Sequence, residues 1–353
     1  MKKFLEAVLW ILLALLSVAL LGVLFLTVAE YRPADREDIA VTGEASAGTL
    51  AAGEPIRILS WNIGYAGLGA ESDFFLDGGK GVASADEETV KRYLSGISET
   101  VASAGADIVM LQEVDLDSSR SYGIDERESL SRSQSMHALN MSCLFVPYPI
   151  PPIGHVETGV FTTTDYEVSS AERISLPCPF RWPVRICNLK RCMLVSYFPI
   201  EGSGKQLVLI NTHLEAYDSG EGKIAQTRQL QQFITAEYEK GNYVIAGGDF
   251  NQSFPGTQEI YPNTHADLWA VGSLGYEDLP DGCIFAFDPS VPTCRLLNQP
   301  YDPSDAEGTQ YYVIDGFILT PNIQLDGVQT LDEHFENSDH NPVSLSVTLL
   351  PEN

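Results

Sequence analysis

The sequence has few basic residues for its length. Against 48 Asp and Glu it has only 21 Lys and Arg in 353 residues, so its formal net charge is −27. Such a surface repels polyanions over most of its area, and tight binding to long nucleic acid is therefore disfavoured. The densest cationic stretch contains Arg181, Arg185, Lys190 and Arg191, and it fits a locally basic groove and a solvated loop equally well.

Closely spaced cysteine pairs are also missing. None of the six cysteines belongs to a CxxC motif or to a Cys/His cluster, which disfavours a zinc site. Their even number is compatible with disulfides in an oxidising compartment, although sequence alone does not give the connectivity. The spacing allows one local bridge among Cys178, Cys187 and Cys192, and another between Cys283 and Cys294.

Internal repeats and low-complexity tracts are lacking as well, whereas 44% of the residues are hydrophobic. A chain of this kind buries a large core and is not mostly disordered. Its length suits one large domain or two ordinary ones.

The longest apolar run lies at the N-terminus. Residues 7–29 carry no charge and are long enough to cross a bilayer as a helix. A cleaved signal peptide is the alternative, but its apolar region is normally shorter, and Thr27-Val28-Ala29 is a mediocre cleavage site. We therefore expect a cytoplasmic N-terminus at 1–6, a retained transmembrane anchor at 7–29 and an extracytoplasmic catalytic domain. The flanking charges do not decide the orientation, since Lys2 and Lys3 before the apolar run are matched by Arg32 and Arg36 after it.

After the anchor, residues 30–54 have little apolar periodicity and are interpreted as a flexible linker, followed by one folded domain at 55–351. Helices are predicted at 86–103, where Val90, Leu94, Ile97 and Val101 form one apolar stripe, and at 221–240. Runs of strand length recur at 56–63, 107–111, 193–198, 207–214, 243–250, 311–319 and 343–350. This mixture favours an α/β fold with two sheets packed face to face and helices outside. The stretches 148–152 and 253–308 are expected to be long loops.

Short polar signatures stand where several of these strands end. They are Trp61-Asn62-Ile63-Gly64, Leu111-Gln112-Glu113-Val114-Asp115, Asn211-Thr212-His213-Leu214, Gly247-Gly248-Asp249-Phe250-Asn251, Ile314-Asp315-Gly316-Phe317 and Ser338-Asp339-His340-Asn341-Pro342. Each alone is explained equally well as a turn cap. Together they deliver acidic, amide and imidazole groups from distant strands, which indicates convergence on one rim. Asp249 and Asn251 are two residues apart, so in an extended chain they point the same way.

This ordered series resembles the endonuclease/exonuclease/phosphatase family, which includes apurinic endonucleases, pancreatic-type deoxyribonucleases, inositol polyphosphate phosphatases and neutral sphingomyelinases. The resemblance covers nearly all of residues 56–349. It implies a four-layer sandwich of two mixed β-sheets flanked by helices, and a divalent metal. It does not choose a substrate, because one fold hosts several.

The metal that the resemblance implies is Mg²⁺, with Mn²⁺ as the alternative. Mg²⁺ prefers oxygen ligands and needs only one or two carboxylates beside substrate phosphate. Glu113 is the first expected ligand, with the amide oxygen of Asn62 beside it and Asp339 completing or supporting the shell. A strand-end turn residue remains the alternative for Asn62.

The catalytic residues implied in the same way are His213, Asp249, Asn251, Asp315 and His340. Asp315 would orient His340 and favour its charged form. Asp249 would orient or deprotonate the attacking water, with Asn251 donating to a phosphoryl oxygen; His340 as general base is the alternative. His213 would bind a phosphate oxygen or assist the leaving group.

The sequence also departs from the family pattern. A catalytic tyrosine is left unassigned among Tyr148, Tyr166 and Tyr197, and the segment 158–162 lacks the usual Ser-Arg form. Arg228 fits a family position that is often basic and fits a solvated helix face equally well. We therefore expect a monomeric, membrane-anchored phosphodiesterase acting on a small molecule or a lipid head group. The alternatives are a nuclease of the same fold and a catalytically silent surface binding module.

Overall fold

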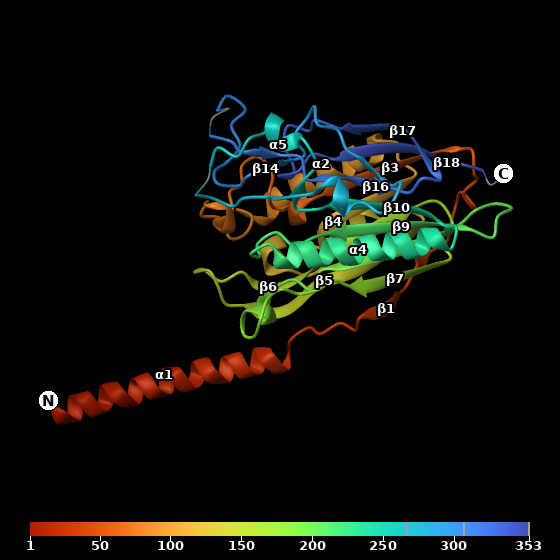
Figure 1. Ribbon diagram of the computed structural model, residues 1–353. Helices are drawn as coiled ribbons and strands as arrows, with labels where there is room; N and C mark the ends of the chain where they lie inside the picture. The colour runs from red at the N-terminus through yellow and green to blue at the C-terminus, as the bar shows by residue number, and fades with distance from the viewer. Residues whose placement is uncertain (266, 306–307, 352–353) are drawn as a thin grey trace.

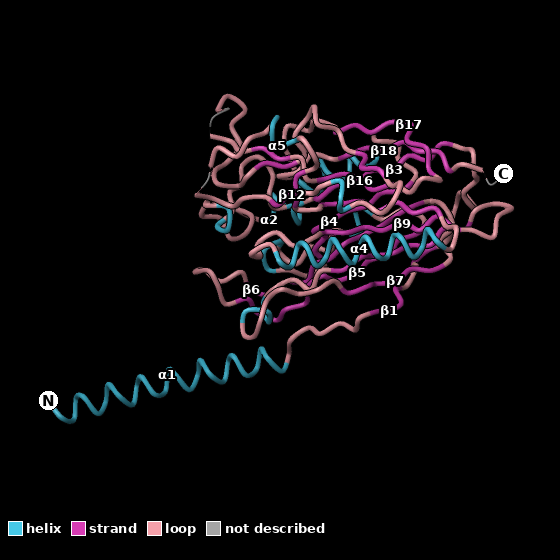
Figure 2. Tube along the Cα trace, in the orientation of Figure 1, coloured by secondary structure: helices cyan, strands magenta, loops and turns pink. Residues whose placement is uncertain are grey.

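The computed structural model describes residues 1–265, 267–305 and 308–351. After the N-terminal helix, the fold is built around two seven-stranded sheets packed face to face (Figures 1 and 2). The first sheet has the order β1 (Arg36–Ile39), β7 (Ser170–Ser175), β8 (Cys192–Pro199), β9 (Gln206–His213), β10 (Tyr243–Asp249), β16 (Asp315–Leu319) and β13 (Ile284–Ala286). The second has the order β17 (Ile323–Thr330), β18 (Val343–Leu349), β3 (Pro55–Asn62), β4 (Ile108–Asp115), β6 (Gly154–Thr164), β5 (Gln134–Val146) and β2 (Thr42–Gly43).

Helices and short strand pairs complete the fold. The helices are α1 (Lys2–Val28), α2 (Glu87–Ser103), α3 (Arg127–Leu130), α4 (Glu221–Glu239) and α5 (Thr257–Ile260). Short 3-10 helices occupy Gly64–Ala66, Phe75–Asp77, Ser119–Ser121, Val184–Cys187 and Tyr276–Asp278. The strand pairs are β11 (Gln252–Ser253) with β12 (Gly272–Ser273), and β14 (Cys294–Arg295) with β15 (Tyr311–Tyr312).

The main core lies between the two sheets. On β3, Ile56 and Ile58 face this interior, and on β9 Leu207 and Leu209 do the same from the opposite sheet. The intervening residues face outward, because successive side chains of a strand point to opposite sides. The interior layer therefore takes every second residue of each strand.

The outward faces are covered by the two long helices. Residues Val90, Leu94, Ile97 and Val101 of α2 are buried with Leu59 and Trp61 of β3. Leu230 and Ile234 of α4 pack with Val208 and Ile210 of β9. The side chain of Asp86 caps α2 by accepting a hydrogen bond of 2.8 Å from the backbone N–H of Thr89. The expected four-layer sandwich and both predicted helices are thus confirmed.

The N-terminal helix α1 runs away from the sandwich (Figure 1). It spans 27 residues, has a mean hydropathy of 2.9 over its most apolar window, and no residue of that window is buried. Its length and composition suit a membrane span or a signal sequence.

The segment expected to be a flexible linker is partly built into the fold. Within residues 30–54, β1 pairs with β7 of the first sheet and β2 pairs with β5 of the second. Leu50 is buried in the core and bridges to Ile200. The composition did not indicate this because these short edge strands are held mainly by backbone hydrogen bonds rather than by an apolar run.

The long segment 253–308 carries several of the short elements given above, and residues 266, 306 and 307 within it lie outside the described part of the chain. The six cysteines are all described, and they form no disulfide. The two suggested local bridges are therefore not formed. The closest thiols are instead those of Cys143 and Cys187, whose sulfur atoms lie 3.9 Å apart.

Candidate active site

Strand register brings three of the predicted residues side by side at one end of the interior layer. Asp249 at the end of β10 pairs with His213 at the end of parallel β9, and with Asp315 at the start of antiparallel β16. Each lies an even number of residues from core residues of its own strand, such as Ile245 on β10 and Leu209 on β9. Each side chain therefore points to the same face as those residues, toward the opposite sheet. On the opposite sheet, Asn62 ends β3 and points to the same face as the interior residue Ile58, four residues before it. The site therefore occupies one end of the space between the sheets.

His340 and Asp315 form a buried pair. His340 Nδ1 lies 2.8 Å from Asp315 Oδ2, and both side chains are almost fully buried. Burial alone would lower the pKa of His340, but the carboxylate of Asp315, together with Cys294 and Asp339, outweighs the effect of burial and raises that pKa well above its usual range. The ring is therefore held as an imidazolium, with Nε2 left for the cleft.

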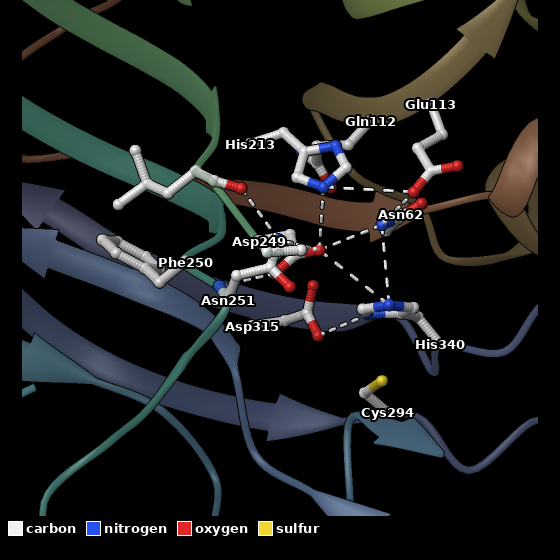
Figure 3. A network of polar contacts seen from close by, with 12 residues as sticks. Asn62, Gln112, Glu113, His213, Asp249, Phe250, Asn251, Cys294, Asp315 and His340 are labelled. Atoms are coloured by element: carbon white, nitrogen blue, oxygen red, sulfur yellow. Dashed lines mark hydrogen bonds and ion pairs between the residues drawn. The ribbon is translucent and has the colours of Figure 1, made fainter. Parts of the chain in front are cut away.

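Asp249 lies at the centre of the polar network (Figure 3). Its Oδ2 accepts a hydrogen bond of 3.0 Å from Asn62 Nδ2 and lies 3.3 Å from His213 Nε2. His340 Nε2 is 3.9 Å from the same oxygen. Burial, together with the charge of Asp315, raises the pKa of Asp249 to about 7. One carboxylate thus contacts groups from both sheets.

His213 differs from His340 in its charge state. Burial first, and then the positive charge of Arg191, lower the pKa of His213 well below its usual range. It is therefore a neutral imidazole whose Nε2 faces the oxygens of Asp249 and Glu113 at 3.3 and 3.9 Å.

Glu113 reaches the site through an irregularity in β4. Pairing with β6 shifts register between Leu111 and Val114, and Glu113 has φ 54°, in the left-handed region that non-glycine residues seldom adopt. Gln112 continues the interior-facing alternation of Ile108 and Met110 and donates to Asn211 at 2.8 Å. Within the bulge, the neighbouring Glu113 also reaches the site and accepts a hydrogen bond of 3.3 Å from Asn62 Nδ2. Backbone strain of this kind is often found at functional sites.

The oxygen atoms at this point fit a divalent cation. Asn62, Glu113 and Asp339 line the same cleft. Burial raises the pKa of Asp339 to about 7, and the charge of Glu113 adds to this effect. Buried like charges are costly without a compensating cation. A donor set of hard oxygen atoms suits Mg²⁺ or Mn²⁺ rather than a soft metal.

A second group with metal-ligating atoms consists of Asp249, Asp315 and His340, whose ligand atoms lie within 4.8 Å of one another. Asp315 Oδ2 and His340 Nδ1 already bond to each other, whereas Asp315 Oδ1 has no hydrogen-bond partner among the described residues. The hydrogen-bonded pair makes this group a poorer cation site than the carboxylates of Glu113 and Asp339.

The two predicted amide residues are already engaged. Asn251 Nδ2 donates to Leu214 O at 2.9 Å and to Asp249 Oδ2 at 3.3 Å, so it orients Asp249 and would have to release a partner to bind a phosphoryl oxygen. Asn62 Oδ1 accepts from the backbone N–H of Gly64 at 3.1 Å. In this arrangement its amide nitrogen, not its oxygen, faces Glu113.

All eight predicted site residues therefore gather in one region. Seven of them line the cleft directly, namely Asn62, Glu113, His213, Asp249, Asn251, Asp339 and His340, and Asp315 lies behind His340. Of the three unassigned tyrosines, Tyr148 lines the cleft, whereas Tyr166 and Tyr197 do not. The side chain of Arg228 is exposed on α4, in agreement with its interpretation as part of a solvated helix face.

Three arginines line the cleft without a role assigned at the sequence level, namely Arg120, Arg191 and Arg295. Arg295 is buried and donates to the backbone carbonyl of Gly69 at 2.9 Å. Arg191 is buried, lines the cleft, and its Nε and Nη1 have no hydrogen-bond partner among the described residues. Arg120 forms a two-point ion pair with buried Asp115 at 3.0 and 2.8 Å and lies over the Tyr65 ring at 3.7 Å. For Arg191 the signal was its place in the dense cationic stretch; no motif marked Arg120.

Comparison with known proteins gives a consistent result. The model of the endonuclease/exonuclease/phosphatase family matches residues 59–340. Among solved structures, the chain is similar to an endonuclease/exonuclease/phosphatase from Beutenbergia cavernae, with 18% identity over 84% of this chain and 72% of that chain and a TM-score of 0.56. It is also similar to one from Bacteroides vulgatus, with 17% identity over 84% and 99% of the two chains and a TM-score of 0.53. At such identities the similarity is one of fold, and no curated protein matches the chain.

Proposed function

The chain belongs to the endonuclease/exonuclease/phosphatase family, and on this basis we propose that it is a phosphodiesterase that uses Mg²⁺ and hydrolyses its substrate by in-line attack of a water molecule. Members of the family are divalent-metal-dependent phosphoesterases and nucleases. The observation that carries the proposal is the buried His340–Asp315 pair at 2.8 Å, placed beside Asp249 and opening on a cleft that Glu113 also lines.

A phosphodiester resists attack because its own negative charge repels the nucleophile. In the proposed mechanism, the His340 imidazolium uses Nε2, which faces the cleft, to hydrogen-bond a phosphoryl oxygen and offsets part of that charge. Asp249 accepts the proton of the attacking water, and Asn251 holds the Asp249 carboxylate in place through its backbone N–H at 2.8 Å. Neutral His213 binds a second phosphoryl oxygen.

Glu113 and Asp339 are the residues that would hold the cation, and Asn62 would join them once its amide turned so that Oδ1 instead of Nδ2 faced Glu113. When bound, Mg²⁺ would neutralise charge on the phosphate and favour deprotonation of a water ligand. Without the cation, the two carboxylates would repel an anionic substrate. Because of Glu113 and Asp339, binding of the cation and binding of the anionic substrate therefore favour each other.

Arg191 extends the phosphate-binding side of the cleft. Its guanidinium is buried, with Nε 3.8 Å from Glu215 Oε2 and with Nη1 lacking a hydrogen-bond partner among the described residues, and a guanidinium forms strong two-point contacts with phosphate. We assign it to the anionic group of the substrate. Arg120 contacts Asp115 and Tyr65 instead, so it supports the β4 bulge that carries Glu113.

A nuclease of the same fold is the second candidate function. The net charge of −27 disfavours it for long nucleic acid. A catalytically silent binding module is the third, and the retained carboxylates argue against it, since buried like charges reduce stability without serving a binding surface.

We further propose that α1 is a retained single-pass anchor and that the catalytic domain is extracytoplasmic. Support comes from the length of the apolar helix and from its lack of packing against the sandwich. We also propose that the chain acts as a monomer.

The test is hydrolysis by the purified full-length chain in detergent. Bis-p-nitrophenyl phosphate, inositol phosphates, sphingomyelin and single-stranded DNA would each be offered with Mg²⁺, with Mn²⁺ and with EDTA. We expect metal-dependent cleavage of the phosphodiesters and loss of that cleavage in Asp249→Asn. Preferential cleavage of DNA would establish the nuclease instead, and inactivity on every substrate with either metal would support the silent module.

A further inference from the structure

Large apolar side chains are exposed together on two neighbouring loops. Leu144 and Phe145 are exposed near the end of β5, and in the connection from β5 to β6 Ile150 is 96% exposed. In the loop between β7 and β8, Trp182 is 56% exposed and Val184 is exposed next to it. Single exposed apolar residues are ordinary, but a contiguous group indicates an interaction surface. We call residues 144–153 and 181–189 the rim.

The two loops of the rim form one packed unit. Ile153, Cys187 and Leu189 pack with the buried cluster of Met141, Cys143, Val146 and Val156. The backbone N–H of Lys190 donates to Asn140 O at 2.6 Å. The inner side of the same unit lines the catalytic cleft through Val146, Tyr148, Ile153 and Leu189. The rim is therefore both a wall of the cleft and an exposed apolar edge.

The rim is also joined to the C-terminal end of α1. Trp182 Nε1 donates to Thr27 Oγ1 at 3.1 Å. Just after the helix, Glu30 lies 3.0 Å from Arg185 Nε and 3.6 Å from Lys190 Nζ. Figure 1 shows this end of α1 next to the loop that follows β7. Where the apolar helix ends, the exposed apolar residues of the rim begin.

The charges around this junction suit a lipid surface. Arg181 in the rim and Arg32 just after α1 are exposed, in a molecule whose net charge is −27. Basic residues next to the end of a membrane helix attract anionic lipid head groups. A tryptophan with its N–H bonded and its ring exposed is typical of the boundary between lipid and water.

We propose that the rim rests on the same bilayer that α1 spans, with Ile150 and Trp182 entering the head-group region, and that the substrate is a lipid whose head group contains a phosphodiester. This inference rests on the proposed function, which includes both the membrane anchor α1 and the phosphodiesterase reaction. The apolar walls of the cleft, such as Phe74, Met141 and Ile153, then contact the part of the lipid nearest its acyl chains. The phosphate reaches Asp249 and His340 at the polar end of the cleft.

Docking is tested first, by a measurement that does not depend on activity. The full-length Trp10→Phe variant removes the anchor tryptophan and is reconstituted in vesicles of phosphatidylcholine and phosphatidylglycerol that contain a lipid spin-labelled close to its head group. We expect quenching of tryptophan fluorescence that disappears in Trp10→Phe/Trp182→Phe and decreases when phosphatidylglycerol is omitted. Equal quenching in the two variants would refute docking, whatever the enzyme hydrolyses.

The substrate class is tested with Ile150→Glu/Trp182→Glu, neither of which lines the cleft. Its matched control is Ile284→Glu, an exposed apolar residue on edge strand β13. We expect the double variant to keep its rate on soluble bis-p-nitrophenyl phosphate within about twofold and to lose about tenfold or more on sphingomyelin or phosphatidylcholine in vesicles. The control should match the wild type on both.

The outcomes separate the two proposals. If the wild-type chain cleaves neither substrate but Trp182 is quenched, docking stands and the proposed hydrolase fails. If the double variant cleaves the vesicle lipid as well as the wild type does, the lipid inference fails and the hydrolase stands. If the rim instead pairs two copies, the wild type would be a dimer in detergent and the double variant a monomer, which would also overturn the lipid inference.

Discussion

The indole Nε1 of Trp61 donates a hydrogen bond of 2.8 Å to the backbone carbonyl of His340, across 279 residues of sequence. Trp61 is fully buried under α2, among Val90 and Ile97. On the same loop, Ser338 Oγ donates to Asn62 O at 2.8 Å. The core of one sheet thus sets the position of the imidazole that faces the substrate.

Replacing Trp61 with Phe should therefore reduce both stability and turnover. The ring volume is largely kept, but the His340 carbonyl loses its partner, which should cost about 1–3 kcal/mol of the free energy of unfolding. We expect kcat to decrease about tenfold or more, because His340 is no longer held in place. Urea unfolding and steady-state kinetics on bis-p-nitrophenyl phosphate measure the two effects. Thr320→Val, which removes a buried hydrogen bond to Val244 at the far end of the first sheet, should reduce stability and leave kcat unchanged.

Substitution of Asp315 by Asn should lower the pKa of His340, because the carboxylate that favours the imidazolium is removed. A charged His340 would then be lost at lower pH, so the alkaline limb of the pH–rate profile should move to lower pH. We expect kcat at neutral pH to decrease about 10²–10⁴-fold. The exposed Asp326→Asn is the matched control. An unchanged alkaline limb in Asp315→Asn would exclude a catalytic role for the imidazolium.

Removal of the cation should abolish hydrolysis, and Mg²⁺ should restore it. Because the carboxylates of Glu113 and Asp339 are crowded together in the cleft, Mg²⁺ should also raise the melting temperature of the wild type by preferential binding to the folded state. In Glu113→Gln we expect the Mg²⁺ concentration for half-maximal activity to rise about tenfold or more, and the thermal shift to shrink. The exposed Glu128→Gln serves as control. A full thermal shift in Glu113→Gln would remove this residue from the cation site.

Arg191 should affect substrate binding more than turnover. In Arg191→Gln, the buried guanidinium that lines the cleft beside Glu215 is replaced by a neutral amide, and KM for a phosphodiester should rise about tenfold, equivalent to about 1.4 kcal/mol. Arg228→Gln, an exposed change on α4, should leave KM unaltered. A decrease in kcat alone would show that Arg191 acts in the transition state and not in binding.

His137 should make stability depend on pH without a role in catalysis. Burial lowers its pKa to about 4, below the value of an unfolded chain, so the unfolded state binds the proton more tightly. The contribution of His137 is therefore present above about pH 6.5 and is lost as the pH falls toward 4. Its size is on the order of 1–3 kcal/mol, since the residue is not fully shielded from solvent. Comparing urea unfolding of the wild type and His137→Gln at pH 5 and pH 7.5 measures it; an equal pH dependence in both would assign the effect to other groups.

The sequence predicted the parts of the fold that have strong local patterns. The stripe of Val90, Leu94, Ile97 and Val101 and the runs that became β3, β9, β10 and β18 were located within a few residues. Strands β5, β6, β7 and β17 were not anticipated. β6 contains consecutive threonines at 162–164, and β17 has only two buried residues among its eight, so neither has a long apolar run.

The predicted site residues lie together in the structure because strand-end motifs report where strands stop, and their individual roles stay predictions. What sequence could not give is the orientation of individual side chains. The bulge at Glu113 and the turned amide of Asn62 depend on backbone dihedral angles and on partners from other strands. Arg191 escaped assignment for the same reason, since only the folded chain places it beside His213.

The short strand β1 has a mechanical consequence. Only residues 29–35 separate the end of α1 from the first pairing of the chain with β7, and seven residues extend at most about 25 Å. If α1 is fixed in a bilayer, this short linker keeps the sandwich close to the bilayer surface. A substrate held farther from that surface than the linker extends could not reach the cleft. The catalytic cleft would then stay close to the bilayer surface, and its substrate would have to reach it by lateral diffusion.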